Sequence, residues 1–286
     1  MNFKDITIGI VAYNSEKVIY ECLNSIRFIK NIIIFDNSND LSLKKKINRK
    51  YPNINFILSK SNLGYGGGNN KIINLCKTKY LFILNPDTIL EQNCEQKLLE
   101  TLNNSEKDIS ILAPISNDKN YGFFGVKKKL KKEKKFEVDY VKGFAMLINI
   151  KIIKDIGKFD ENFFLYLEEI DLCRRLRNSN YSIYVDSHAK VKHLGAKSSN
   201  LGFEFEKCRN WHWMWSNFYY TKKYNNQIST LAKYIPQLFL LLIKIAGNLI
   251  FFKKKKITIN LFRLSGLFNS IIGNKSWYRP KIFIYK

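Results

Sequence analysis

Two groups of carboxylates stand out in a chain that is otherwise rich in lysine. Asp87 follows a short apolar run within Asn85-Pro86-Asp87, and Glu168, Glu169 and Asp171 follow an aromatic run. A carboxylate at a strand tip can hold Mg²⁺ or Mn²⁺ against a diphosphate, because these cations prefer one or two carboxylates plus phosphate oxygens. A carboxylate crowded against apolar side chains has a raised pKa and suits general-base work. Together the two groups indicate metal-assisted transfer chemistry on an anionic substrate.

Each of these residues also has a simpler interpretation. Asp87 fits a turn residue that caps the following helix. The three acids would each stabilise the first turn of a helix by about 0.3–1 kcal/mol through its dipole, but the dipole does not explain three acids behind an aromatic run. We therefore expect at least one of them to be catalytic. His193 alone would be a packed or surface histidine, and with a metal at Asp87 it becomes a candidate ligand.

Short apolar runs alternate with amphipathic segments through the chain. Strands are expected at 6–11, 31–35, 54–58, 80–84 and 109–113, and helices at 16–28, 41–51, 69–76 and 91–102. This alternation indicates βαβ units and a mostly parallel sheet covered on both faces, which is an α/β fold. Further along, strands are expected at 140–150, 181–185 and 191–193, with a helix at 168–177.

Polar clusters follow three of these strands. They are Tyr13-Asn14, Asp36-Asn37-Ser38 and Asn85-Pro86-Asp87. In α/β sheets ligands bind beyond the carboxyl ends of the strands, and packing alone does not require polar groups at three such ends. Asp36 fits either a hydrogen-bond acceptor for a nucleoside or an Asx turn with the two residues after it.

The segment Gly64–Gly68 is expected to be a loop that precedes the helix at 69–76. Its spacing matches neither GxGxxG nor GxxxxGK[ST], so it is not a standard phosphate loop. It fits either a loop that lets the backbone approach a ligand closely or a merely flexible loop.

The composition favours an anionic partner. Lys plus Arg number 48 against 24 Asp plus Glu, which gives a net charge of +24 in 286 residues. Such an excess suits nucleic acid, a phosphate-bearing substrate or an anionic membrane. The five cysteines form no CxxC pair, which argues against zinc and disulfide frameworks and fits buried thiols of a reducing cytoplasm. Because residues 1–5 lead directly into a strand, no cleavable signal peptide is expected.

The C-terminal part has a different character. Residues 207–286 contain no Asp or Glu but 15 Lys plus Arg, and the apolar run 234–252 is interrupted by Lys244 and closed by Lys253–Lys256. An in-plane membrane helix accommodates such a lysine by snorkelling, whereas ordinary helical packing is the alternative. We expect a domain over 1–226 and a basic amphipathic helical tail over 227–286. The lysine-rich run 126–135 is expected to be a solvated loop.

These motifs, in this order, resemble those of inverting nucleotide-sugar glycosyltransferases of family 2, which have the GT-A fold. Within that family the chain looks like bacterial rhamnosyltransferase-type enzymes. Ile10–Asn14 is similar to the first strand of the family, and Asp36-Asn37-Ser38 to its nucleoside-contacting strand end. Asn62–Asn70 resembles its glycine-rich segment, and Asn85-Pro86-Asp87 a variant of its DXD motif.

The acceptor side carries the rest of the resemblance, which covers residues 6–224 in all. Residues 157–164 and 167–175 are similar to the segment in which an acidic pair supplies the catalytic base, and His193-Leu194-Gly195 to the family's histidine segment. The usual pair is Glu-Asp, whereas this chain has Glu168-Glu169. The base therefore falls on Glu169, one methylene longer than usual, unless Glu168 or Asp171 takes that role.

The resemblance implies a single-displacement, inverting transfer of a sugar from a nucleotide-diphosphate donor to a glycan or lipid-linked acceptor in bacterial surface polysaccharide synthesis. It implies Mg²⁺ or Mn²⁺ at Asp87, for which His193 is a candidate additional ligand. The basic tail predicts an enzyme held peripherally on the cytoplasmic face of the cell membrane by an anionic surface. Implied donor-binding residues are Tyr13, Asn14, Asp36, Asn37, Gly64, Asn69 and Asn85.

Two other classes of function remain open from the sequence. A nucleic-acid-binding protein would account for the charge, but it would interleave basic and aromatic residues on its sheet. This chain instead places Asn and Asp at its strand ends, which argues against nucleic acid as a partner. A non-catalytic sugar- or membrane-binding relative would not need Asp87, Glu169 and His193 together.

Overall fold

The computed structural model describes residues 1–106, 108–116, 134–195 and 202–279. The chain forms two compact units. The first comprises Met1–Asp160 with Glu169–Ser199, and the second comprises Glu161–Glu168 with Asn200–Lys286. Most of the run 126–135 lies outside the described residues, so the loop expected there stays a prediction.

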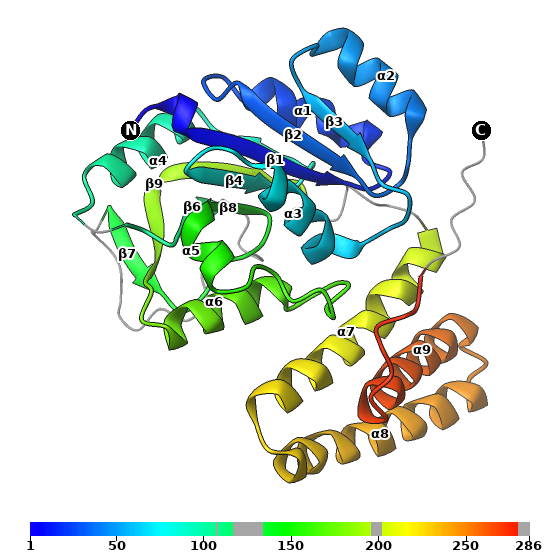
Figure 1. The fold of residues 1–286 in the computed structure, drawn as a ribbon. Helices are drawn as coiled ribbons and strands as arrows, with labels where there is room; N and C mark the ends of the chain where they lie inside the picture. Colours follow the sequence, from blue (N-terminus) through cyan, green and yellow to red (C-terminus); the bar gives the residue numbers. More distant parts are fainter. Residues whose placement is uncertain (107, 117–133, 196–201, 280–286) are drawn as a thin grey trace. The chain divides into compact units, whose positions relative to one another are not determined.

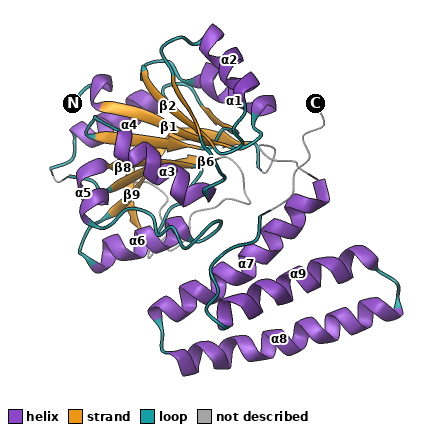
Figure 2. Cartoon of the chain, turned by 45° about the vertical axis from the view of Figure 1, so that its right-hand side comes forward, coloured by secondary structure: helices purple, strands orange, loops and turns teal. Residues whose placement is uncertain are grey.

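The first unit is built on one mixed sheet whose strand order is β3-β2-β1-β4-β8-β6-β9-β5, with β7 paired to β9 (Figures 1 and 2). The neighbouring strands β1 to β4 are all parallel, β6 is parallel to β9, and the other pairings are antiparallel. The strands are β1 (Ile6–Ala12), β2 (Asn31–Asp36), β3 (Asn55–Leu58), β4 (Tyr80–Leu84), β5 (Thr88–Leu90), β6 (Ile111–Ser116), β7 (Lys135–Val138), β8 (Ala145–Asn149) and β9 (Ile183–His193).

Helices cover both faces of this sheet, because successive residues of a buried strand point to opposite sides. On β4, Phe82 and Leu84 join one apolar cluster, and Leu81 and Ile83 join the other. The first cluster includes residues of α1 (Glu16–Ser25), α2 (Leu41–Lys50) and α4 (Cys94–Asn103). The second includes residues of α3 (Gly64–Leu75), α5 (Ile150–Asp155) and α6 (Glu168–Asn178). The α/β architecture expected from the alternating pattern is confirmed.

The strands expected in the first half of the chain are confirmed, and the second half is less regular. β8 occupies only residues 145–149 of the expected strand at 140–150, and α5 follows it directly. The two short strands expected at 181–185 and 191–193 are parts of one strand, β9. All five cysteines are free and buried.

The loop expected at Gly64–Gly68 is wrong, because α3 begins at Gly64 and these glycines lie within the helix. They permit a close approach to the sheet. A Cβ atom on Gly68 would lie 2.8 Å from Cγ1 of Val11, and one on Gly9 would lie 2.9 Å from Cγ2 of Ile72. Gly68 therefore serves helix–sheet packing at the end of β1 rather than loop flexibility.

The second unit consists of α7 (Gly202–Tyr224), α8 (Gln227–Ile250) and α9 (Lys254–Ile271), with the segment Glu161–Glu168. The helices share an apolar cluster of Met214, Phe218, Tyr234, Leu241 and Leu267. The compact unit thus begins near residue 200, earlier than the boundary expected after 226, because α7 packs on α9. The contact is closest at Gly266, where a Cβ atom would lie 2.2 Å from the carbonyl oxygen of Trp211.

We expect Gly266→Ala to lower the stability of the protein by about 1–3 kcal/mol, because the added methyl group forces the two helices apart. Gly247→Ala is the matched control. It also lies inside a helix, but its Cβ atom would meet no atom within 4 Å. The control should raise stability by about 0.5–1 kcal/mol, because alanine is the better helix former. Thermal denaturation of the full-length variants measures both, and equal melting temperatures would contradict the packing argument.

Candidate functional site

Asp87 and His193 lie side by side at the carboxyl end of β4. Asp87 is 1% exposed, and its Oδ1 atom lies 3.3 Å from Nε2 of His193. The geometry of this contact does not make a hydrogen bond, and neither carboxylate oxygen of Asp87 has a hydrogen-bond partner among the described residues. A buried carboxylate in this condition has lost water without gaining a donor, which is costly unless a cation or donor binds there.

Main-chain contacts fix this pair in place. Thr88 on β5 is paired in register with His193 on β9, and the N–H of Leu194 donates to the carbonyl oxygen of Asp87 at 3.0 Å. The carbonyl oxygen of Phe144 accepts from the N–H of Asn85 at 2.8 Å and from the hydroxyl of Thr88 at 3.2 Å. The ring of Phe144 also stacks on His193, with 4.6 Å between centroids. The carboxylate and the imidazole therefore have one defined arrangement.

Asp87 and His193 can supply only part of the ligands of a divalent cation, so a substrate would have to supply the others. The described residues contain no group of three or more His, Cys, Asp or Glu side chains that could hold a metal. Asp87 and His193 offer one carboxylate and one imidazole. Mg²⁺ and Mn²⁺ typically complete such a set with phosphate oxygens and water, so the two residues fit a metal that arrives with a diphosphate.

Glu169 lies in the first turn of α6 and is half-buried. Burial raises the pKa of its carboxyl group above the ordinary value. The N–H groups of Glu169 and Ile170 and the positive charge of Lys142 oppose this rise without cancelling it. A carboxylate with a raised pKa is the chemical requirement for a general base that works near neutral pH.

The two neighbouring acids have different surroundings. Glu168 is buried and belongs to the second compact unit. Asp171 is fully buried and accepts from Nε of Arg175 at 2.8 Å. The guanidinium also donates to the carbonyl oxygens of Ile156 and Lys158 after α5, so Asp171 joins α6 to the preceding loop. This ion pair favours a structural role for Asp171 over the catalytic alternative that the sequence left open.

The expected donor-binding residues at the ends of β1 and β2 come together. Ala12 pairs with Asp36, and the N–H of Asn14 donates to the hydroxyl of Ser38 at 3.2 Å. Asp36 forms the Asx turn: its carboxylate accepts from the N–H groups of Ser38 at 3.2 Å and Asp40 at 2.7 Å. Tyr13 lies half-buried beside them, so this edge combines an aromatic side chain with polar groups.

Asn37 and Gly64 form a structural link at the same edge. The Asn37 amide donates to the carbonyl oxygen of Gly64 and accepts from the N–H of Leu63, both at 3.0 Å. Asn69 is fully buried on α3, and its Oδ1 atom has no hydrogen-bond partner among the described residues. The side-chain amide of Asn37 thus bonds to the protein itself, whereas the Oδ1 atom of Asn69 can accept a hydrogen bond from a ligand. Asn85 is half-buried in the turn before Asp87.

The segment 141–144 was missed from the sequence, and it connects Glu169 with the Asp87–His193 pair. Lys142 places its charge near Glu169, Gly143 accepts a hydrogen bond from the hydroxyl of Tyr65 on α3, and Phe144 holds His193. A Cβ atom on Gly143 would lie 2.9 Å from that hydroxyl oxygen. The only sequence signal was this glycine, which lay inside an expected strand.

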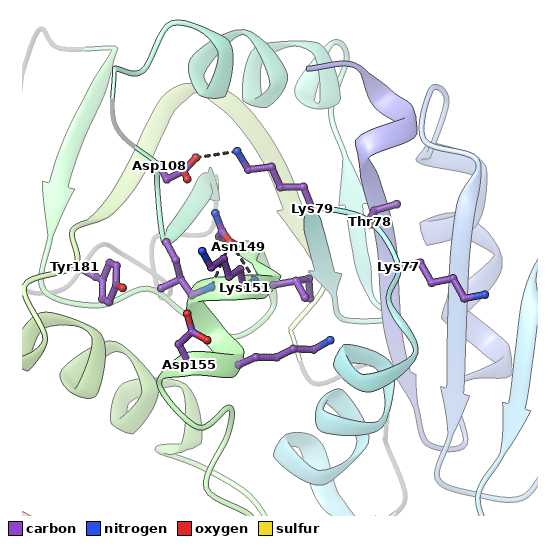
Figure 3. A pocket seen from close by; sticks show the side chains of 11 residues that line it. Lys77, Thr78, Lys79, Asp108, Asn149, Lys151, Asp155 and Tyr181 are labelled. Atoms are coloured by element: carbon purple, nitrogen blue, oxygen red, sulfur yellow. Dashed lines mark hydrogen bonds and ion pairs between the residues drawn. The ribbon is translucent and has the colours of Figure 1, made fainter.

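A cleft of about 740 Å³ opens at the opposite end of β4, where the chain enters the strand (Figure 3). Lys77, Lys79, Lys151 and Lys154 give it a basic rim, and Asp108 pairs with Lys79 at 2.9 Å. The described residues that line it include none of those expected to bind donor or metal or to act as a base. Asp87, His193 and the polar residues after β1 and β2 lie instead at the carboxyl edge of the sheet, and their roles stay predictions.

Comparisons with known proteins give the fold and family context. Residues 7–157 match the family described as glycosyl transferase family 2. The hexosyltransferase Agl10 of low-salt glycan biosynthesis in Haloferax volcanii is 31% identical over 200 residues, which are 63% of this chain and 64% of that protein. Rhamnosyltransferase WbbL of Escherichia coli is 28% identical over 238 residues, 72% of this chain and 88% of that protein.

A solved structure supports the fold independently. The mannosyltransferase PcManGT from Pyrobaculum calidifontis, in complex with GDP-Man and Mn²⁺, superposes with a TM-score of 0.59 at 10% identity, over 93% of this chain and 87% of its own. The expected GT-A fold is thereby confirmed. The chain spans slightly less than two thirds of the length of Agl10.

We expect Glu169→Gln and Asp171→Asn to change stability in opposite directions. Because the pKa of Glu169 is raised in the folded state, its contribution to stability is present below the unfolded pKa and is lost as pH rises through the folded pKa. Glu169→Gln avoids that loss, so its melting temperature should rise relative to wild type as pH increases from about 4, the unfolded pKa, towards neutrality. Asp171→Asn should cost about 3 kcal/mol at neutral pH, the lower end for breaking a buried pair, since Arg175 is 21% exposed.

Thermal denaturation across this pH range checks both variants. A melting temperature for Glu169→Gln that falls further below wild type as pH rises would contradict the buried, raised-pKa carboxylate. An unchanged melting temperature for Asp171→Asn would remove the structural role and return Asp171 to the candidate bases.

Proposed function

The chain belongs to glycosyl transferase family 2, and from this membership and the geometry we propose an inverting transfer of a hexosyl or deoxyhexosyl group. The donor is a nucleoside diphosphate sugar, and the acceptor is a hydroxyl of a glycan or lipid-linked glycan in surface polysaccharide synthesis. One observation carries the proposal: a carboxylate with a raised pKa at Glu169 and a buried carboxylate without a donor at Asp87 are joined through the segment 141–144.

Glu169 is the general base of this reaction. Its carboxylate accepts the proton of the acceptor hydroxyl as the oxygen forms a bond to the anomeric carbon. The bond from that carbon to the diphosphate breaks on the opposite face, and the diphosphate leaves with the electron pair. Because this is a single displacement, the configuration inverts and no second carboxylate nucleophile is needed. Lys142 near Glu169 favours the ionised base before the acceptor binds.

Asp87 and His193 would hold the divalent cation, Mg²⁺ or Mn²⁺. When bound, such a cation neutralises the charge that develops on the leaving diphosphate. The stacking of Phe144 on His193 and the hydrogen bonds of Asn85 and Thr88 orient these two residues before the donor arrives. PcManGT, whose structure contains GDP-Man and Mn²⁺, is compatible with this assignment.

The edge formed by β1, β2 and α3 binds the nucleotide part of the donor. Tyr13 and Asn14 contact it from the turn after β1, Asp36 from the end of β2, and Asn85 from the turn before Asp87. The amide oxygen of Asn69 is buried without a hydrogen-bond partner among the described residues. Buried polar atoms usually have a partner, and the donor can supply one here. Asn37 and Gly64 support this edge through their mutual hydrogen bond.

We place the enzyme on the cytoplasmic face of the membrane through α8 and α9. By length and composition α8 could cross a membrane. Only 17% of its apolar window is buried inside the protein, so most of this apolar surface is available for contact with lipid. Phe239 and Ile243 on α8 are exposed, as are Phe251 and Phe252 beside the four lysines 253–256. Apolar side chains next to a lysine cluster match an in-plane helix on anionic lipid, and Lys244 near the helix centre disfavours a span.

Two variants separate the two halves of this chemistry. Asp87→Asn should abolish the Mn²⁺-dependent part of nucleoside diphosphate binding, because it removes the carboxylate charge and keeps the shape. Glu169→Gln should bind nucleoside diphosphate as wild type does and slow transfer by about 10²–10⁴-fold, the usual contribution of a general base. Thermal shift with UDP, GDP and dTDP, with and without Mn²⁺, identifies the nucleotide, and product formation with that donor measures turnover.

Asp155→Asn, an exposed carboxylate on α5, is the control for a general charge effect. Mn²⁺-dependent binding that persists in Asp87→Asn would exclude Asp87 as the metal carboxylate. Full activity of Glu169→Gln together with an inactive Glu168→Gln would move the base to Glu168.

Replacing Lys253–Lys256 with glutamine should weaken binding to phosphatidylglycerol vesicles strongly, because each lysine near anionic lipid contributes about 1 kcal/mol. Replacing the four lysines of α2 (44, 45, 46 and 50) removes the same charge from the first unit and should have little effect. Vesicle flotation at low and high salt measures both, and salt should weaken wild-type binding. Wild-type protein that ignores phosphatidylglycerol vesicles would exclude the membrane assignment.

A further inference from the structure

Trp213 is an exposed aromatic residue in a buried stretch of α7. Its neighbours from Trp211 to Ser216 are buried, whereas Trp213 is 47% exposed. Single exposed apolar residues need no explanation in general. Trp213 differs because the surrounding groups hold its indole in a defined position with its surface accessible.

Tyr166 and Arg209 provide that position. The ring of Tyr166 meets the indole of Trp213 edge-on, with 5.4 Å between centroids and an interplanar angle of 84°. Nε of Arg209 donates to the hydroxyl of Tyr166 at 2.7 Å. Arg209 precedes Trp213 by four residues on α7, so the two exposed side chains lie on the same face of the helix. All three residues belong to the second compact unit.

The backbone that presents Tyr166 is strained. Tyr166 and Leu167 are consecutive residues with φ of 73° and 70°, a conformation that is unfavourable for side chains with a Cβ atom. The two residues before Tyr166 are held on α7: the hydroxyl of Ser216 donates to the carbonyl oxygen of Leu165 at 2.8 Å, and His212 packs on Phe164. Strain that the surrounding structure maintains is characteristic of functional segments, and this segment leads directly into Glu168 and Glu169.

We propose that Trp213, Tyr166 and Arg209 form a binding site for a pyranose ring of the acceptor glycan, with Arg209 favouring a ring that carries a phosphate or carboxylate. The C–H face of a pyranose is apolar and weakly positive, so it stacks on the negative face of an indole. The guanidinium makes charge-assisted hydrogen bonds to an anionic substituent. That the bound sugar is the acceptor of the reaction rests on the proposed function, whereas the binding of a charged sugar at this site does not.

Saturation-transfer NMR without any donor tests the site. The probes are the 1-phosphates of glucose, galactose and N-acetylglucosamine, compared with methyl α-glucoside and inorganic phosphate. At least one sugar phosphate should bind more tightly than either comparison compound. Trp213→Ala should weaken it by about tenfold or more, and Trp213→Phe should restore much of the affinity.

Trp277→Ala is the matched control, because Trp277 is also an exposed indole of the second unit, at 55%. It should bind the sugar phosphate as wild type does. Equal affinity of Trp213→Ala and wild type, or of inorganic phosphate and every sugar phosphate, would overturn the proposal. Loss of phosphatidylglycerol binding in Trp213→Ala, with sugar binding intact, would make Trp213 a membrane contact instead.

The outcomes also separate this site from the proposed reaction. Nucleoside diphosphate binding with Mn²⁺ should be unchanged in Trp213→Ala, since that variant leaves the first unit intact. If Glu169→Gln proves fully active while Trp213→Ala loses sugar binding, the base assignment fails and the sugar site stands.

Discussion

The arrangement of the site depends on the carbonyl oxygen and ring of one residue, Phe144. Its carbonyl oxygen accepts from the N–H of Asn85 and the hydroxyl of Thr88, which fixes the turn that carries Asp87. Its ring stacks on His193 at the end of β9. These contacts arise because β8 runs antiparallel to β4 and so delivers its first residues to the carboxyl edge of the parallel strands. The segment that enters this strand of opposite direction thereby connects the carboxyl edge of the sheet with Glu169 on α6 through Lys142.

The buried carboxylates of the first unit differ in how their oxygens are satisfied. Glu95 accepts from three consecutive N–H groups after α1, Asp186 accepts from Thr101, His188 and Ala189, and Asp171 pairs with Arg175. Such contacts replace the lost water and make these acids part of the fold. Both oxygens of Asp87 lack a hydrogen-bond donor among the described residues. Since an unsatisfied buried charge is costly, Asp87 is the carboxylate whose retention calls for a ligand.

The sequence predicted what depends on local patterns and missed what depends on tertiary contacts. Apolar runs such as 80–84 located the parallel strands, and polar groups after them located the candidate site, because strand ends meet at one edge. The glycines at 64–68 were expected to form a loop, because the close packing of Gly68 on Val11 is visible only in the fold. Likewise, the sequence left Asp171 open as an alternative to Glu169, because the contacts of Arg175 with Ile156 and Lys158, which hold its guanidinium beside Asp171, appear only in the fold.

The boundary between the two units falls between Glu168 and Glu169, at the first turn of α6. The eight residues before it are anchored on α7 through Leu165 and Phe164, while the rest of α6 belongs to the core of the first unit through Leu172 and Leu176. In the proposed reaction the base therefore stands where the chain passes from one unit to the other. The two residues before Glu168, Tyr166 and Leu167, have φ of 73° and 70°, a conformation that side chains with a Cβ atom adopt only at a cost.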